Sequence, residues 1–382
     1  MGIGGYTLAV RDQATLGLLG EVDDYSQLEA VSRYNGVGQW QLHLDGASAA
    51  AALLLGYDRG LVLLRNGSPV YSGPVGGYER SQDRSRHTLV VRGPCDNTYL
   101  ARALAWPEAP ALTTATSEYD VRTGLASAVL YGYVDANCGP GAHSTRRVPG
   151  LALATDPGLG STITGRARWD KLHELLASLA LASDPALGWQ VLWEPGGVLR
   201  CTVYEPVDLA TEFAFGFDFG NLLAYSYSVG EPEATYAVVG GAGDGIARTY
   251  AMAGDSSAMV ERGRYEGFTD SSGTSDAGEL EQARLGYLAG AAAASALSIT
   301  PVDTAAVVYG ETYQLGDRVR VVTADGTIDD LVREVRLVLD AGGVQVVPTV
   351  ASPDQRDARV PRLFDRVRHL ERLTRATPGV HR

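Results

Sequence analysis

The chain has 382 residues, 45% of them hydrophobic and 20% charged, a composition typical of a globular protein with more than one domain. Its net charge of −13 disfavours nucleic acid as a specifically bound partner, because neutralising phosphates requires a basic surface. No apolar run is long enough for a membrane span, no secretory signal opens the chain, and three widely spaced cysteines do not suit a disulfide framework, so we expect folding in a reducing cytoplasm.

The first hundred residues alternate polar and apolar side chains between turn signals, which is the pattern of β-strands. Residues 1–95 are therefore predicted to form a meander or a small β-barrel-like domain. Its strands are expected at residues 6–10, 39–44, 60–64, 70–73 and 88–92. A glycine-rich turn at residues 33–38 precedes the second of them.

The pattern changes after Pro94, and residues 96–206 are predicted to be an inserted α+β domain. Helices are expected at residues 99–105, 121–134 and 167–181. The second helix is inferred from the spacing of Val121, Leu125, Val129 and Tyr133. A hairpin is expected over residues 189–206, closed by Pro195-Gly196-Gly197.

Four of the six phenylalanines stand at strict period two, which predicts one strand face. They are Phe213, Phe215, Phe217 and Phe219. We expect this face to be buried, either in the core of its own domain or against another subunit.

A second β-barrel-like domain is predicted over residues 251–352, with a helix at 279–297 and strands at 304–308, 317–323, 331–340 and 344–350. Residues 207–250 are expected to complete the first one. The segments 60–79 and 316–335 share an order of glycine, apolar strand, Asn-Gly or Asp-Gly turn and further strand. This order fits two similar domains and also fits two unrelated meanders. The predicted fold class is α+β, mainly β.

The C-terminal residues 353–382 are predicted to be a basic helix or tail. Residues 356–382 carry eight arginines against three acidic residues, a local charge of +5 that leaves −18 for residues 1–355. Leu363, Val367 and Leu370 lie on an a/d seam too short to be stable alone. Two packings stay open, a three-helix bundle and a helix lying on its own subunit.

The stretch VVGGAGDGIAR, residues 238–248, resembles a phosphate-binding loop at first sight. It lacks the Lys-Ser or Lys-Thr pair of a P-loop, and no helix pattern follows it. We predict instead a sharp strand-to-strand crossing that needs the freedom of its glycines, with Arg248 pairing with an acidic neighbour. The four glycines are Gly240, Gly241, Gly243 and Gly245.

Enzyme signatures give no candidate catalytic, cofactor or metal residue. Asp218-Phe219-Gly220 has no kinase catalytic loop to match it, and His173-Glu174 lacks a second histidine four residues from the first. Cys138 and His143 have no further ligands at metal spacing. We therefore predict a protein that is not an enzyme and uses no cofactor.

Three motifs in order resemble the tail-hub proteins (baseplate hub or tail-tip proteins) of long-tailed bacteriophages, particularly those infecting actinobacteria. An aromatic strand leads to the glycine-rich segment that ends at Arg248. Later, Leu315, Gly316 and Asp317 match a Leu-Gly-Asp turn that opens a strand. Residues 33–44, RYNGVGQWQLHL, resemble the family's opening strands.

The resemblance implies a homotrimeric hub, made in the host cytoplasm and built into the distal end of a phage tail. Two barrel-like domains per chain would give a pseudo-sixfold ring that joins the tail tube to the tail tip and lets DNA pass without specific binding. The implied partners are the distal tail protein, the tape-measure protein and the receptor-binding or fibre proteins, with no membrane insertion. Two alternatives stay open: a tail-associated cell-wall hydrolase and a host-surface-binding adaptor.

Overall fold

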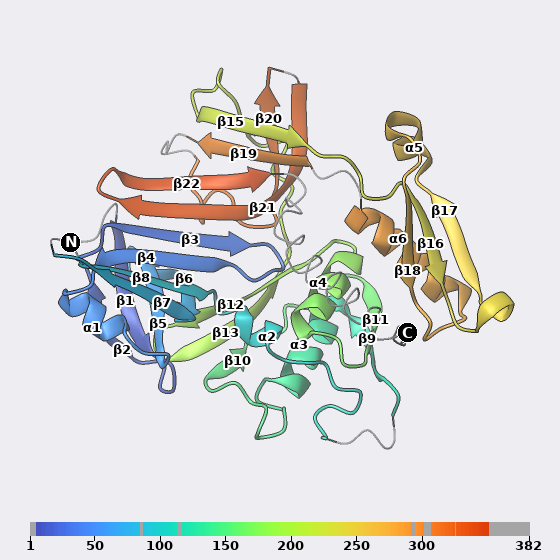
Figure 1. Ribbon diagram of the computed structural model, residues 1–382, viewed down its shortest axis with the longest axis horizontal. Helices are drawn as coiled ribbons and strands as arrows, with labels where there is room; N and C mark the ends of the chain where they lie inside the picture. Colours follow the sequence, from blue (N-terminus) through green and yellow to red (C-terminus); the bar gives the residue numbers. More distant parts are fainter. Residues whose placement is uncertain are drawn as a thin grey trace, which may run out of the picture. The chain divides into compact units, whose positions relative to one another are not determined.

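The computed structural model describes residues 5–84, 87–112, 117–291, 295–301, 307–324 and 326–350 (Figure 1). Strands predominate and helices are few, which confirms the predicted fold class. The chain divides into two compact units. Unit 1 comprises Met1–Tyr225 and Ser298–Val350, and the described residues of unit 2 lie within Ser226–Leu297.

The main sheet of unit 1 combines strands from both ends of the chain. Its order is β15 (Leu222–Val229), β19 (Ser295–Pro301), β22 (Gly343–Val350), β21 (Gly326–Asp340), β3 (Gln27–Arg33), β4 (Gln39–Asp45), β8 (His87–Pro94) and β7 (Gly77–Gln82). The central pairing is antiparallel, with Leu28 opposite Leu339 and Ala30 opposite Leu337. Figure 1 shows β22, β21, β3 and β4 side by side.

This pairing differs from the predicted division into two barrel-like domains. Residues 207–250 had been expected to complete the first domain. The strand that pairs with β3 is instead β21, from residues 326–340. The long β21 also pairs through its first half with β20 (Arg318–Thr323), which in turn pairs with β14 (Ala214–Phe215). Among the described strands no sheet closes on itself, so the barrel-like expectation gives way to open sheets.

A second sheet of unit 1 has the order β2 (Leu18–Val22), β1 (Tyr6–Asp12), β5 (Arg59–Arg65) and β6 (Ser68–Pro74). Leu8, Val10, Val62 and Leu63 on these strands are buried. The short helix α1 (Ala49–Leu54) begins at Ser48, whose hydroxyl accepts a hydrogen bond from the Ala51 N–H (3.1 Å). The strands predicted over the first hundred residues are confirmed, while β2, β3 and β7 had no prediction.

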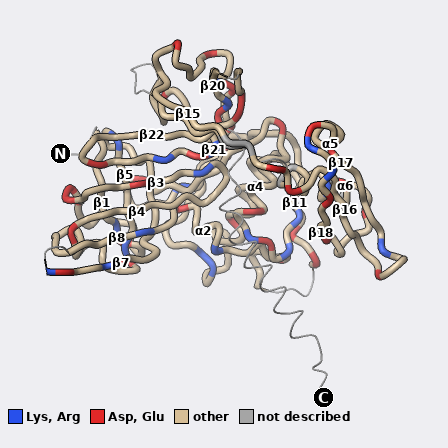
Figure 2. The backbone as a smooth tube through the Cα atoms, turned by 45° about the horizontal axis from the view of Figure 1, so that its top comes forward, with Lys and Arg blue, Asp and Glu red and all other residues tan. Residues whose placement is uncertain are grey.

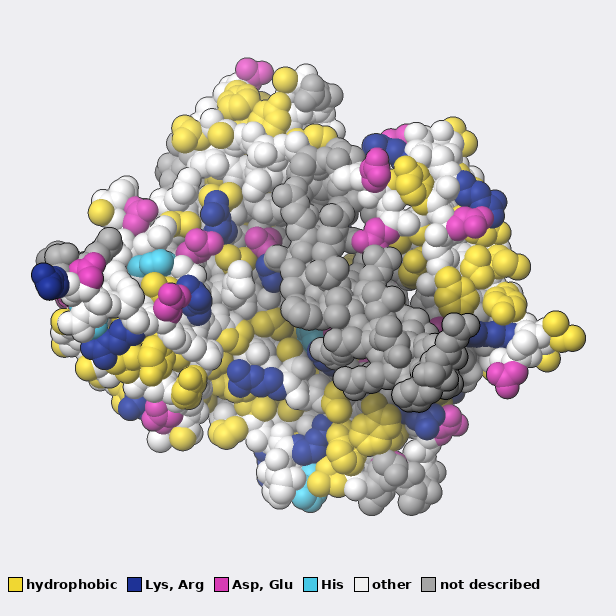
Figure 3. Space-filling view, in the orientation of Figure 1, with side chains coloured by type: hydrophobic (Ala, Val, Ile, Leu, Met, Phe, Trp, Pro, Cys, Tyr) yellow, Lys and Arg dark blue, Asp and Glu magenta, His cyan; other side chains and the backbone are white. Residues whose placement is uncertain are grey.

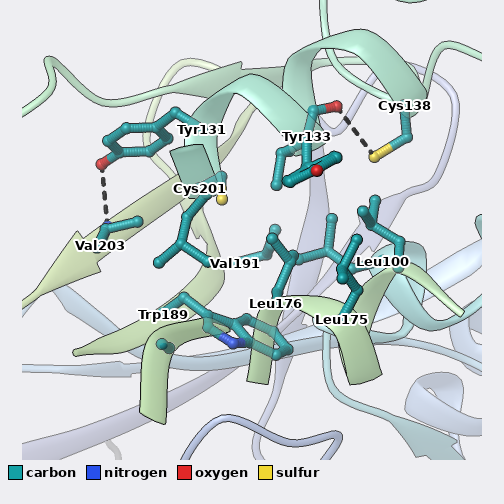
Figure 4. Close-up of a cluster of buried hydrophobic side chains, with 14 of the residues drawn as sticks. Leu100, Tyr131, Tyr133, Cys138, Leu175, Leu176, Trp189, Val191, Cys201 and Val203 are labelled. Atoms are coloured by element: carbon teal, nitrogen blue, oxygen red, sulfur yellow. Dashed lines mark hydrogen bonds between the residues drawn. The ribbon is translucent and has the colours of Figure 1, made fainter. Parts of the chain in front are cut away.

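The inserted region of unit 1 packs helices against a hairpin. Its elements are α2 (Thr98–Ala101), β9 (Asp120–Leu125), α3 (Ala126–Asn137), β10 (Leu151–Leu153), β11 (Thr162–Ala167), α4 (Leu172–Ala182), β12 (Gly188–Glu194) and β13 (Val198–Tyr204). Figure 4 shows Leu175 and Leu176 of α4 beside Trp189 and Val191 of β12. The predicted hairpin and the helix α4 are confirmed.

Several predicted helix limits are wrong. Residues 121–125 form strand β9, which pairs with β11, and Val121 and Leu125 are exposed whereas Val129 and Tyr133 are buried. The helix predicted at 99–105 is the four-residue α2. The helix predicted at 167–181 begins only at Leu172, because residues 162–167 are β11.

Unit 2 is a three-stranded sheet with a helix on one face. The strand order is β17 (Tyr250–Gly254), β16 (Tyr236–Gly240) and β18 (Glu266–Asp270), and α5 (Ser256–Arg262) connects β17 to β18. The helix α6 (Ala277–Ala291) packs on the face that carries Ala237 and Val239, both fully buried. A side chain at Gly267 would collide with Tyr287 of α6. Gly267 of β18 therefore faces α6, and its neighbours Glu266 and Phe268 face the opposite side.

Residues 295–301 form β19, so the helix predicted at 279–297 ends earlier, at Ala291. Most of the strand predicted at 304–308, and the whole C-terminal segment with Leu363, Val367 and Leu370, lie outside the described residues. No helix in the described part of the chain is long and apolar enough to cross a membrane.

Candidate assembly site

The Leu315-Gly316-Asp317 turn lies in unit 1 where the C-terminal strands meet the end of the inserted region. The Leu315 carbonyl accepts a hydrogen bond from the Tyr204 hydroxyl (3.1 Å). Gly316 has φ +90°, and a side chain there would collide with the Tyr34 ring. Only glycine fits this position, because both the backbone conformation and the space exclude a Cβ.

Asp317 fixes the same turn by binding two backbone segments at once. Its Oδ1 accepts from the N–H of Val207 and its Oδ2 from the N–H of Gln314, each at 2.8 Å. The residue is 3% exposed, and burial raises the pKa of its carboxyl above the usual 3.8 despite these two hydrogen bonds. The Leu-Gly-Asp motif thus connects β13 and β20.

The glycine-rich turn at residues 33–38 makes a similar connection to the start of β12. The Tyr34 hydroxyl and the Asn35 Nδ2 both donate to the Leu187 carbonyl, at 2.8 and 2.9 Å. Burial raises the pKa of Tyr34 to about 12, so its hydroxyl remains protonated and able to donate. Asn35 adopts φ +49°, which asparagine tolerates better than most residues.

Side chains, rather than another strand, cover the outer edge of β12. Its backbone N–H groups at Trp189, Val191 and Trp193 donate to the side-chain oxygens of Asn35 (3.0 Å), Asn97 (2.7 Å) and Ser72 (2.9 Å), respectively. We call Asn35, Ser72 and Asn97 the β12 edge clamp. Alternate residues of a strand direct their N–H groups to the same edge, so the clamp satisfies a row of donors that an unpaired edge would leave open.

A buried ion pair supports the β12 edge clamp. The Ser72 hydroxyl donates to Asp96 Oδ2 (2.5 Å), and Arg11 Nη1 donates to the same oxygen (2.8 Å) while its Nη2 contacts Oδ1. Both charged side chains are fully buried. Arg11 and Asp96 therefore orient the hydroxyl that binds Trp193, and they join β1 to the residues that follow β8.

The glycine segment joins β16 to β17 in unit 2 as a hairpin connection, interrupted by a 3₁₀ turn at Gly245–Ala247. Gly243 has φ +106°, and a Cβ there would lie 2.6 Å from the Ala247 carbonyl oxygen. Arg248 donates to the carbonyls of Gly240 (3.0 Å) and Gly241 (2.9 Å) and forms an ion pair with Asp270. The arginine therefore closes the loop within its own chain.

The four phenylalanines do not form one strand face. Only Phe215 belongs to a strand and is fully buried, where it contacts Phe213 and Tyr313 edge to face. Phe217 and Phe219 follow in a turn and are 54% and 60% exposed. Burial of the whole face in its own domain is therefore wrong, and burial of these two residues against another subunit stays a prediction.

The described residues contain no cluster of three or more His, Cys, Asp or Glu side chains suited to a metal. Burial raises the pKa of Cys95 to about 11 and that of Cys138 and Cys201 to about 12, so these thiols stay protonated at neutral pH and are poor nucleophiles. Burial also lowers the pKa of His173.

The β12 edge clamp was not predicted from the sequence. Its members stand at positions 35, 72 and 97, and their common target is more than ninety residues away from each of them. The only local signal is an asparagine within a glycine-bearing turn at Asn35.

Comparison with known proteins gives a family and a fold. Residues 7–350 match the family described as Siphovirus ReqiPepy6 Gp37-like protein. No curated protein sequence matches significantly.

Three solved structures share the fold at low sequence identity. The 43 kDa tail protein of prophage MuSo2 from Shewanella oneidensis is 15% identical with a TM-score of 0.57, covering 91% of this chain and 98% of its own. The tail protein from Neisseria meningitidis MC58 is 13% identical with a TM-score of 0.54, and the match covers 91% of this chain and 97% of that protein. The prophage tail protein gp18 from Listeria monocytogenes EGD-e is 10% identical with a TM-score of 0.51, and the match covers 94% of this chain and 99% of that protein.

Proposed function

Because the chain belongs to the Siphovirus ReqiPepy6 Gp37-like family and has the fold of phage tail proteins, we propose that it is a structural hub of a phage tail. In this proposal three copies form a ring of pseudo-sixfold symmetry at the distal end of the tail. The ring joins the tail tube and distal tail protein to the tail tip, and it has no enzymatic role. An actinobacterial host remains a prediction from the sequence.

The observation that carries the proposal is the main sheet of unit 1. Strands β3, β4, β7 and β8 from the start of the chain continue into β21 and β22 from its end, so one sheet extends across both predicted β domains. The Leu-Gly-Asp turn and the β12 edge clamp attach the inserted region to this sheet. Such an internally tied body suits a wall that must keep its shape while other proteins attach to it.

Phe217 and Phe219 are the residues that we propose for contacts between copies. Both are more than half exposed, Phe217 lies 5.8 Å from the Tyr225 ring, and Leu223, four residues after Phe219, is 69% exposed. Exposed large apolar side chains that gather in one place mark interaction surfaces. In the ring, a neighbouring copy would bury their remaining exposed surface, and each would then contribute about 1–1.5 kcal/mol to association.

The charge distribution supports passage of DNA without specific binding. Residues 1–355 carry −18, and like charge repels the phosphate backbone. Figure 2 shows acidic and basic residues interspersed along the backbone rather than a basic stripe on one element. A nucleic-acid-binding protein is expected to present such a stripe.

Gold-labelled antibody against this protein, bound to intact virions and viewed by electron microscopy, tests the proposed place in the particle. We expect label at the distal end of the tail. Label on the head or along the whole tail tube would contradict the proposal. Clearance of host cell walls by the purified protein would favour the hydrolase alternative instead.

A further inference from the structure

One face of the unit 2 sheet is apolar, and among the described residues no helix or strand of unit 2 covers it, apart from Met259 of α5 at its edge beside Gly254. Residues of the three strands alternate between α6 and the opposite side, and the opposite side carries Tyr236, Val238, Tyr250, Met252 and Phe268. We call these five residues the open face. Tyr250, Met252 and Phe268 are 48%, 58% and 55% exposed, whereas Ala237 and Val239 on the α6 side are fully buried.

The open face is continuous across the strands. Val238 at the centre lies opposite Met252 of β17 and Phe268 of β18, so these three side chains form one row. Figure 3 shows hydrophobic side chains gathered over this part of the molecule, with charged side chains among them. A contiguous apolar row on a sheet is expected to be covered by another element.

Charged groups border the open face and restrict what can cover it. Arg248 lies 5.8 Å from the Tyr250 ring centre and 5.7 Å from that of Phe268, and Arg264 lies 3.7 Å from that of Tyr236. Asp270 and Glu266, which pair with these arginines, remain more than half exposed. Residues 226–297 have ten acidic and four basic side chains, a net charge of −6. A basic apolar partner therefore fits it best.

We propose that the C-terminal segment 362–376 of this chain binds the open face as an amphipathic helix. The sequence of this segment, RLFDRVRHLERLTRA, spaces Leu363, Val367 and Leu370 along one helical face, and residues 356–382 carry +5. Hydrophobic and charge complementarity thus point to the same pair of surfaces. The segment is too short to be stable as an isolated helix, so it needs a surface to fold on.

The length of the C-terminal segment also suits the sheet. The segment has fifteen residues, the same number as α6, which covers the other face of the sheet. Its binding would complete a helix–sheet–helix sandwich, a stable arrangement of layers. The segment that binds belongs either to the same copy or to a neighbouring one, and the inference does not depend on the proposed hub function.

Methionine oxidation by dilute hydrogen peroxide reads out coverage of the open face in the full-length protein. Of the three methionines in the sequence, Met252 lies on the open face, and Met259 of α5 lies against Gly254 at the edge of the same face. Oxidation rate follows exposure. We expect Met252 to oxidise several-fold faster in the double variant Leu363→Asp/Leu370→Asp than in the wild type.

A second pair of variants tests the charge contribution. Arg366→Glu/Arg372→Glu should also accelerate Met252 oxidation, and 0.5 M salt should do so in the wild type, where screening shortens the Debye length to about 4 Å. Val260→Asp, at a 90% exposed position of α5, should leave the rate unchanged. Equal rates of Met252 oxidation in the wild type and in both double variants would overturn the inference. Such a result would mean that Met252 is exposed or that something other than this segment covers it.

A disulfide between the introduced cysteines of Phe268→Cys/Leu370→Cys distinguishes the two sources of the segment. A cross-linked monomer on a denaturing gel indicates the same copy, and a cross-linked multimer indicates a neighbouring copy. The native Cys95, Cys138 and Cys201 are buried and leave the assay clear. No cross-link, with both cysteines reactive to a thiol reagent, would again overturn the inference.

Discussion

The Oδ1 atom of Asn97 accepts a 2.7 Å hydrogen bond from the backbone N–H of Val191, 94 residues further along the chain. On its other side, Asn97 donates to the Gly36 carbonyl at 2.7 Å. One buried amide thus connects the first β-rich segment, the residues after β8 and the inserted hairpin. This relationship explains how the three-stranded sheet β10-β13-β12 is held in unit 1 although no further described strand pairs with β12.

Asn97→Ala removes the central member of the β12 edge clamp and leaves the buried Val191 N–H and the partly buried Gly36 carbonyl without this partner. Each unsatisfied group costs about 1–3 kcal/mol, so we expect a clear loss in the free energy of unfolding. Denaturant unfolding followed by tryptophan fluorescence measures it, since Trp189 and Trp193 flank Val191. Gln190→Ala, at an exposed position of the same strand, is the matched control and should change little.

Asp96→Ala removes the acidic partner of Arg11 and the acceptor of Ser72. Removing one member of a buried ion pair leaves an uncompensated charge and costs about 3–5 kcal/mol. The thermal midpoint of the variant should therefore fall by more than that of Asn97→Ala. Asp58→Ala is the control, because its partner Arg59 is also close to Asp12 and the Asp58 side chain is 65% exposed. A stability loss no greater than in the control would contradict the supporting role of Asp96.

Asp317→Asn keeps one side-chain acceptor of the Leu-Gly-Asp turn and loses the other, so we expect a destabilisation of about 1–3 kcal/mol at neutral pH. The folded-state pKa of Asp317 is raised by burial, so its protonation stabilises the folded state. That contribution is fully present below the unfolded value near 3.8 and is lost as the pH rises through the folded-state value.

The wild type should therefore exceed Asp317→Asn in stability by more at pH 4 than at pH 7. Urea unfolding of both proteins across this range measures the difference. A difference that narrows as the pH falls would show that the Asp317 pKa is not raised in the folded protein.

Gly243→Val tests the glycine segment. The positive φ and the nearby Ala247 carbonyl both oppose a branched side chain, and the strain should cost about 1–3 kcal/mol. Gly245→Asn is the matched control, because Gly245 has φ +55°, within the region that asparagine adopts, and open space around it. Hydrogen exchange in β16 and β17 should rise in the valine variant alone. Equal exchange in the two variants would mean that the loop needs no glycine at residue 243.

Phe217→Ser/Phe219→Ser should weaken association of the copies without unfolding the chain, because both side chains are exposed in the single chain. Size-exclusion chromatography of a dilution series measures the shift toward the monomer, and circular dichroism checks the fold. Val121→Ser, at another exposed apolar position, should leave the elution volume unchanged. An unchanged elution volume for the phenylalanine variant would place the contact elsewhere.

Local patterns predicted most strands because alternating side chains and Gly-containing turns are properties of short segments. They failed where pairing between distant residues decides the structure. Val121, Leu125, Val129 and Tyr133 have the spacing of a helix, yet residues 120–125 pair with β11 some forty residues away. The period of a sequence does not reveal such a partner.

The contacts of the candidate site were likewise predictable only where they arise from a short segment. The Leu-Gly-Asp motif could be found because its glycine and aspartate carry local turn signals. The β12 edge clamp could not, because Asn35, Ser72 and Asn97 become related only when three separate segments reach one strand. The phenylalanine pattern predicted a long strand, but β14 contains only Ala214 and Phe215, since β20 pairs with just these two residues.

The mass of the full-length protein in solution tests the central claim most directly. Multi-angle light scattering on the purified protein is expected to give about 121 kDa, three times the chain mass of 40.4 kDa, as a ring of three copies requires. A mass that stays at 40.4 kDa at every concentration measured would contradict the trimeric hub.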